Sequence, residues 1–139
     1  MRVDSAKSAL LIHAVAYIAV IALCAAFALS HSPPRQWFLW VAAGWGIGLA
    51  AHALAVWLTQ ARHSVRVLAD PRVRGLAIHA FVYVAFVALL FGVNIAAGTH
   101  HWWAVWVALG WGVGATVHGW AALVNRRRPT RSSERRSEP

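Results

Sequence analysis

The sequence predicts an all-α membrane protein, a bundle of four transmembrane helices built from two repeated helical hairpins. The chain of 139 residues is 60% hydrophobic and only 12% charged, a composition typical of proteins embedded in lipid. A shift of 66 residues, from His13 to His79, aligns the chain with itself without a gap. Such self-similarity is the signature of a structural repeat, so both halves are expected to fold alike.

The repeat is most informative at its polar, aromatic and glycine positions, because leucine, alanine and valine match readily between any two apolar helices. Besides His13 and His79, the matching pairs are Tyr17 and Tyr83, Trp37 and Trp103, Trp40 and Trp106, Gly44 and Gly110, Trp45 and Trp111, Gly46 and Gly112, Gly48 and Gly114, and His52 and His118. Any site in one half is therefore expected to have a counterpart in the other.

Four apolar stretches each approach the length of about 20 residues that a helix needs to cross the hydrocarbon core of a membrane. None contains Asp, Glu, Lys or Arg, and they cover approximately residues 8–29, 37–58, 75–97 and 102–124. Because a helix satisfies its own backbone polar groups in lipid, we expect four transmembrane helices. The first pair forms one repeat within residues 1–60, and the second pair forms the other within residues 75–124.

Basic residues indicate the orientation, since short cytoplasmic loops and flanks carry the excess of Lys and Arg. They gather before the first helix, in the linker 61–74 and in the tail 125–139, whereas the outer turns hold only Arg35. We therefore predict a multi-pass protein of the inner (plasma) membrane with both termini cytoplasmic. The first helix repeats the His and Tyr of the third, so we expect it to be retained rather than cleaved as a signal peptide.

The basic tail 125–139 is too polar to fold alone and is predicted to be disordered. Its arginines are expected to contact anionic lipid headgroups. The net charge of +9 is thus explained by the membrane, and no nucleic acid is expected. A second copy of the chain or another membrane protein is a candidate partner.

Each predicted helix carries one histidine about 10 Å inside the cytoplasmic boundary. Two hairpins with the same orientation are naturally related by a pseudo-two-fold axis along the membrane normal, near which we expect the four imidazoles to converge. The aromatic residues and glycines that share a helix face with them complete a candidate site. Its residues are His13, Tyr17, Trp45, Gly48, His52, His79, Tyr83, Trp111, Gly114 and His118.

Four interpretations of the histidine layer stay open. In the first, the His and Tyr side chains stabilise helix packing without any cofactor. In the second, two histidines hold b-type haem for electron transfer or redox sensing, and Gly48 and Gly114 leave space for the macrocycle. A bare copper or zinc ion on His13, His52 and their repeats is the third. A proton-sensing cluster is the fourth. If a ligand is bound, haem is the one that the sequence favours.

The acidic residues exclude several chemistries, because all of them lie outside the predicted spans. They are Asp4, Asp70, Glu134 and Glu138. A di-iron carboxylate site and a proton relay of buried carboxylates therefore have no residues to form them. Nor does the sequence offer a Ser-His-Asp arrangement or a phosphate-binding loop. The sequence thus favours a protein that is not an enzyme.

Each half resembles the bacterial 2TM domain family, whose pattern is a His, a Tyr four residues later, a Trp-containing outer turn, a Gly-Trp-Gly-x-Gly motif and a closing His. The second half fits best and includes Asn94, which we expect to bond a backbone group; the first half has Ala28 there. The resemblance implies a small integral membrane module, sometimes fused to signalling domains. It does not imply haem.

Overall fold

The computed structural model describes residues 2–32, 36–98 and 100–125 and contains the four predicted helices. The chain order is α1 (Arg2–Leu29), α2 (Phe38–Ala61), α3 (Pro71–Ala96) and α4 (Trp103–Asn125), with a short 3₁₀ helix, η1 (Arg66–Ala69), between α2 and α3. The described part of the chain contains no strand. The all-α prediction is therefore confirmed, and the predicted tail 125–139 lies outside the described residues apart from the last residue of α4.

The helices reach further into the linker 61–74 than the apolar stretches suggested. At the start of α3, the Asp70 carboxylate accepts a hydrogen bond from the Arg72 backbone N–H at 2.8 Å, and Pro71 occupies the first turn. Both features favour a helix start, because the cap satisfies an otherwise free N–H and proline needs none. The Arg74 guanidinium donates to the carbonyls of Leu68 and Ala69, which holds η1 against α3.

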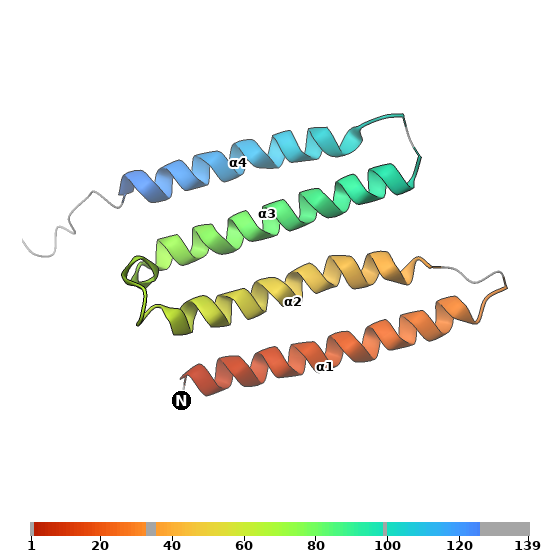
Figure 1. The fold of residues 1–139 in the computed structure, drawn as a ribbon, viewed down its shortest axis with the longest axis horizontal. Coiled ribbons are helices and arrows are strands. Elements are labelled where there is room, and N and C mark those ends of the chain that lie inside the picture. Colours follow the sequence, from red (N-terminus) through yellow and green to blue (C-terminus); the bar gives the residue numbers. More distant parts are fainter. Residues whose placement is uncertain (1, 33–35, 99, 126–139) are drawn as a thin grey trace, which may run out of the picture.

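The four helices lie side by side in one layer, in the order α1, α2, α3, α4 (Figure 1). Contacts join α1 to α2, α2 to α3, and α3 to α4, whereas α1 and α4 have no contact among the described residues. The N-terminal end of α1, the linker with η1 and the C-terminal end of α4 lie at one end of the layer (Figure 1). The C-terminal ends of α1 and α3 and the N-terminal ends of α2 and α4 lie at the other end (Figure 1).

This layer differs from the predicted closed bundle, which would bring α1 against α4 around a pseudo-two-fold axis. The physical reason is visible within each hairpin. Among the described residues, His13 and Tyr17 of α1 bond to α2 and Tyr83 of α3 bonds to α4, so these polar groups are satisfied without contact between the two hairpins. The prediction of paired helical hairpins thus agrees with the contacts, and the closure of the bundle does not.

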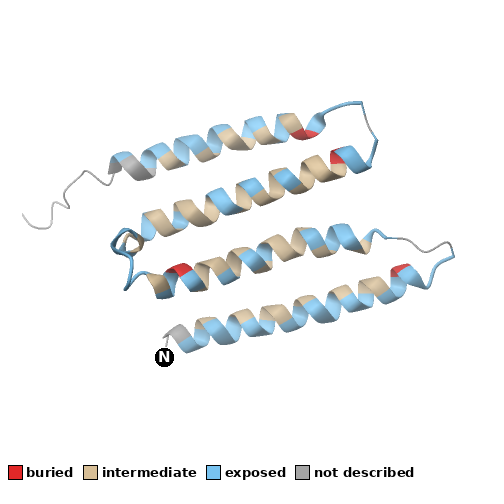
Figure 2. Cartoon of the chain, in the orientation of Figure 1, coloured by how far each residue is buried: buried red, intermediate tan, exposed pale blue. Residues whose placement is uncertain are grey.

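Very few side chains are buried (Figure 2). Among the described residues, only Ala28, Leu58, Asn94 and Ala104 are enclosed by the chain itself. Large apolar side chains instead face outward, as expected when lipid replaces water as the surrounding medium. The segments Asp4–Leu29, Phe38–Ala61 and Pro71–Ala96 are long and apolar enough to cross a membrane.

The fourth predicted span forms helix α4, of 23 residues, antiparallel to α3 (Figure 1). It is not among the three segments that meet the length and apolarity criteria within the described residues. Three membrane-spanning helices are therefore supported by composition, and α4 by its pairing with one of them. The chain is a helical membrane protein.

Candidate functional site

In the first hairpin, α1 and α2 are joined by a chain of three aromatic side chains. The two Nδ1 atoms of His13 and His52 are 3.2 Å apart, and the Trp45 indole N–H donates to His13 Nε2 at 2.9 Å. The imidazole centroids lie 5.5 Å apart and are tilted by 49°. All three side chains are half-buried. Both ring nitrogens of His13 are thus occupied by other side chains.

The donors and acceptors in these contacts assign the proton positions on the two neutral imidazoles. An indole N–H can only donate, so His13 Nε2 is an unprotonated acceptor. The His13 proton then resides on Nδ1 and is donated to Nδ1 of His52. The proton of His52 is consequently on Nε2. The hydrogen bonds therefore run in one direction, from Trp45 to His13 and from His13 to His52.

The second hairpin holds the equivalent residues differently. His79 and His118 stack, with centroids 5.4 Å apart and an interplanar angle of 29°. The Trp111 ring meets His79 edge-on at 6.3 Å. Within the described part of the chain, none of these three rings has a hydrogen bond through its nitrogens. The repeated residues therefore meet in pairs in both hairpins, but only the first pair is hydrogen-bonded.

The two tyrosines make the same contact in both hairpins. The Tyr17 hydroxyl donates to the Ala42 carbonyl at 3.1 Å, and the Tyr83 hydroxyl donates to the Ala108 carbonyl at 2.9 Å. Each carbonyl belongs to the residue four positions before a glycine. A side chain at that later position would cover the carbonyl. The absence of a side chain at that glycine allows the hydroxyl to approach.

The glycines in question are Gly46 and Gly112. A Cβ on Gly46 would lie 3.4 Å from the Tyr17 hydroxyl oxygen, and a Cβ on Gly112 only 2.9 Å from that of Tyr83. Sequence reasoning missed both, although their spacing from the paired carbonyls recurs in each repeat. It chose Gly48 and Gly114 instead, where an added Cβ would meet nothing within 4 Å.

Asn94 bonds backbone groups at the end of the second hairpin where α3 connects to α4. Its amide donates to the His101 carbonyl at 3.0 Å, and its side-chain oxygen accepts from the Ala104 backbone N–H at 3.2 Å. The side chain is 1% exposed. Because the first N–H groups of a helix have no intrahelical acceptor, Asn94 caps α4 from the neighbouring helix. The prediction that it bonds backbone groups is confirmed, and the first hairpin has the buried Ala28 there.

The predicted convergence of four imidazoles does not occur. His13 meets His52 and His79 meets His118, and no hydrogen bond or ring contact links the histidines of different hairpins among the described residues. No group of three or more potential metal-ligating side chains forms in that part of the chain. The site is therefore two separate pairs.

The first pair does not fit an axially ligated haem in this arrangement. With metal–nitrogen distances of about 2.0–2.1 Å, two imidazoles on opposite sides of an iron hold their nitrogens about 4 Å apart, with the macrocycle between the rings. The Nδ1 atoms of His13 and His52 are closer, at 3.2 Å, and bonded to each other. In the second pair, the rings of His79 and His118 stack with their centroids 5.4 Å apart.

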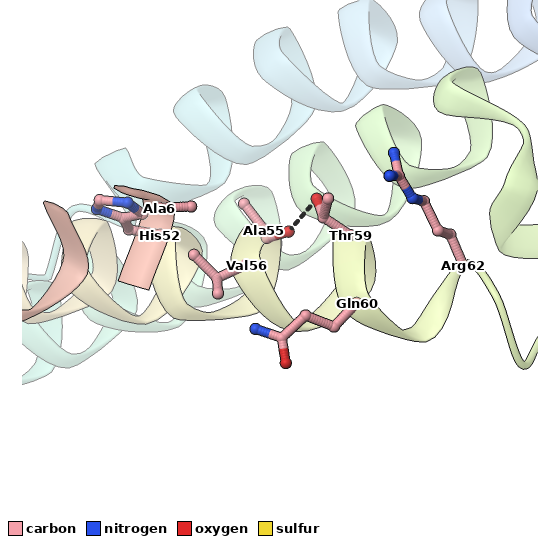
Figure 3. A pocket seen from close by; sticks show the side chains of 7 residues that line it. All are labelled: Ala6, His52, Ala55, Val56, Thr59, Gln60 and Arg62. Carbon is pink, nitrogen blue, oxygen red and sulfur yellow. Dashed lines mark hydrogen bonds between the residues drawn. The ribbon is translucent and has the colours of Figure 1, made fainter. Parts of the chain in front are cut away.

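A pocket of about 430 Å³ lies beside the first pair, where α1 and α2 approach the linker (Figure 3). It is lined by Ala6, His52, Ala55, Val56, Thr59, Gln60 and Arg62. The Thr59 hydroxyl is already bonded to the Ala55 carbonyl at 2.7 Å. Of the ten candidate site residues, only His52 lines this pocket, so it is not the haem site predicted from the sequence.

Comparison with known protein families agrees with the repeat. The 2TM domain matches the chain twice, at residues 3–66 and at residues 71–137, which together cover most of its length. The chain belongs to the 2TM domain family. The two matches confirm a tandem duplication of this domain, with one hairpin of the layer in each copy. No curated protein and no solved structure matches the chain.

Proposed function

We propose that this tandem 2TM protein is a cofactor-free membrane module, a structural element or a partner of signalling proteins, in which the His, Tyr and Trp side chains hold each hairpin together. Polar side chains in lipid are costly when unpaired, and pairing them across two helices stabilises the hairpin. Both tyrosines and the whole His13–His52–Trp45 chain are paired in this way. Such residues need no ligand to explain their presence.

The observation that carries this proposal is that both ring nitrogens of His13 are hydrogen-bonded to other side chains. Its Nδ1 faces His52 and its Nε2 accepts from Trp45, so neither nitrogen is available to a metal without breaking a hydrogen bond. To bind a haem iron, a copper ion or a zinc ion, the histidines would need free ring nitrogens that point at the same metal. The contacts therefore favour helix packing over the ligand hypotheses.

The test is spectroscopic. The protein is expressed with ample haem and metal salts, purified in detergent, and examined by visible absorption in oxidised and reduced states together with metal analysis. We expect a colourless protein with far less than one metal ion per chain. A haem band that is present in the wild-type protein and lost in His79→Ala or His13→Ala would overturn the proposal in favour of redox function.

The proposed setting is the inner membrane, with both termini in the cytoplasm. The basic residues of the linker and the shared location of the helix ends support this orientation. In a Cys24→Ser background, Ser64→Cys in the linker should react with a membrane-impermeant thiol reagent only in inverted vesicles. The matched variant Ser32→Cys, after α1, should react in intact spheroplasts. The reverse pattern would contradict the orientation.

A further inference from the structure

The contact between the two hairpins is made by one face of α2 and one face of α3. A Cβ on Gly44 of α2 would lie 4.0 Å from Leu89 of α3, which identifies the two faces. Positions spaced by three and four residues share a helix face. On α2 these are Gly44, Ile47, Ala51, Leu54 and Leu58, and on α3 they are Ile78, Val82, Ala85, Leu89 and Val93. All ten are half-buried or buried, and Leu58 is only 4% exposed.

The repeat gives α4 the same face as α2, but α4 is the edge of the layer. The equivalent residues are Gly110, Val113, Val117, Trp120 and Val124. Every one is exposed, with exposed fractions of 66% for Val113 and 72% for Trp120. A Cβ on Gly110 would meet nothing within 4 Å. This face therefore lacks the helix that covers its counterpart on α2.

At the opposite edge, α1 repeats the face of α3. The equivalent residues are Ile12, Ala16, Ala19, Leu23 and Phe27. All are exposed, and Leu23, the counterpart of Leu89, is 71% exposed. The layer thus ends on one side with an uncovered α2-like face and on the other with an uncovered α3-like face. The two faces are the two halves of one interface that the chain already contains.

We propose that α4 of one copy of this chain packs against α1 of a second copy, through the contact that joins α2 to α3. The directions agree, because α4 and α1 of copies with the same membrane orientation are antiparallel, as α2 and α3 are (Figure 1). Small residues permit a close approach of helices in lipid, and Gly110, Ala16 and Ala19 provide them on the two faces.

The contact is heterologous, since each copy offers a different face to each neighbour. Repetition of such a contact leads to a closed ring if the rotation between copies closes, and to an open row if it does not. This assembly does not depend on the cofactor-free function proposed above, because neither face includes a histidine or tyrosine of the two hairpin centres.

Disulfide crosslinking in native membranes tests the proposal. All variants are made in a Cys24→Ser background, which removes the single native cysteine. One chain carries Leu23→Cys and a second, differently tagged chain carries Gly110→Cys. We expect a crosslinked dimer when the two are co-expressed and oxidised, and none when either is expressed alone. Gly44→Cys with Leu89→Cys in one chain is the positive control, since the interface between the hairpins already exists there.

The matched negative control replaces Leu23→Cys by Ala22→Cys, which lies at nearly the same depth but about 100° around the helix. The Ala22→Cys and Gly110→Cys pair should give several-fold less dimer. A double variant with Leu23→Cys and Gly110→Cys in one chain should form a ladder of oligomers. A crosslinked monomer would instead show that the two faces close within one chain, as a four-helix bundle. No crosslink despite a working positive control would show that lipid covers them. Either result overturns the proposal.

Discussion

The two hairpins share their conspicuous residues but differ in how those residues are used. In the first, Trp45, His13 and His52 form a continuous hydrogen-bond chain between α1 and α2. In the second, the equivalent rings only stack or meet edge-on, while Asn94 adds hydrogen bonds to two backbone groups at the start of α4. The first hairpin thus has a histidine hydrogen bond that the second lacks, and the second has an asparagine cap where the first has Ala28.

This difference separates two parts of the duplicated motif. The tyrosine and glycine contact is constrained by shape, and the histidine pair of the first hairpin is constrained by hydrogen bonding. The tyrosine contact recurs in both copies, and the approach to the glycine is closer at Gly112, where an added Cβ would lie 2.9 Å from the tyrosine oxygen, than at Gly46, where it would lie 3.4 Å away. The histidine pair has kept its residue types while its geometry has changed. Substitutions at equivalent positions should therefore have unequal effects, and the sizes of those effects can be ordered.

The largest effect is expected for Asn94→Ala, which makes the second hairpin resemble the first at this position. It removes two hydrogen bonds and leaves the buried N–H of Ala104 without its side-chain acceptor, at a cost of about 1–3 kcal/mol. Thermal unfolding in detergent measures the loss. Hydrogen exchange of the Ala104 amide locates it, and unchanged protection of that amide would contradict the assigned cap.

A smaller effect is expected for Gly112→Ala. Its Cβ would lie 2.9 Å from the Tyr83 hydroxyl oxygen, so the hydroxyl must move and its bond to Ala108 weakens. Overpacking costs about 1–3 kcal/mol, and the better helix propensity of alanine offsets about 0.5–1 kcal/mol. The net destabilisation is therefore about 1 kcal/mol.

Three control variants sharpen this comparison. Gly46→Ala should cost less than Gly112→Ala, because its Cβ would lie 3.4 Å from the Tyr17 hydroxyl oxygen. Gly48→Ala and Gly114→Ala point into open space and should be neutral or slightly stabilising. The four variants are compared by unfolding temperature in the same detergent. Equal effects at Gly112 and Gly114 would show that the tyrosine contact does not govern the choice of glycine.

The smallest effect distinguishes the two tryptophans. Trp45→Phe removes the indole donor to His13, worth about 0.6 kcal/mol for an average hydrogen bond between membrane helices. Trp111→Phe removes no such bond among the described residues and should change stability less. A double substitution of Trp45→Phe with His13→Phe should be less destabilising than the sum of the two single ones. Strict additivity would indicate that these two side chains do not interact.

The sequence predicted the helices and the hairpins well, because apolar length and the repeat are both written along the chain. It also predicted that His13 and Tyr17 share one helix face, since residues three and four apart do so, but it directed that face to a common centre of all four helices. It failed on bundle closure, because the same contacts within each hairpin are compatible with a layer or a bundle. It failed on Gly46 and Gly112 as well, because their role depends on which carbonyl a tyrosine on another helix reaches.

The asymmetry of the two histidine pairs was also beyond sequence reasoning. His13 and His79 align, and so do their tyrosine, tryptophan and histidine neighbours. The His13 and His52 rings are tilted by 49° and the His79 and His118 rings by 29°, a difference that the matching residues do not predict. The sequence could predict which helices pair. It could not predict the direction of each hydrogen bond.

The central claim, that histidines pair within their hairpins and that only the first pair is hydrogen-bonded, can be tested by nitrogen NMR on protein labelled with ¹⁵N-histidine. We predict a coupling across the hydrogen bond between Nδ1 of His13 and Nδ1 of His52, with the proton on His13, and no such coupling between His79 and His118. A coupling between histidines of different hairpins, or its absence at His13 and His52, would contradict the account.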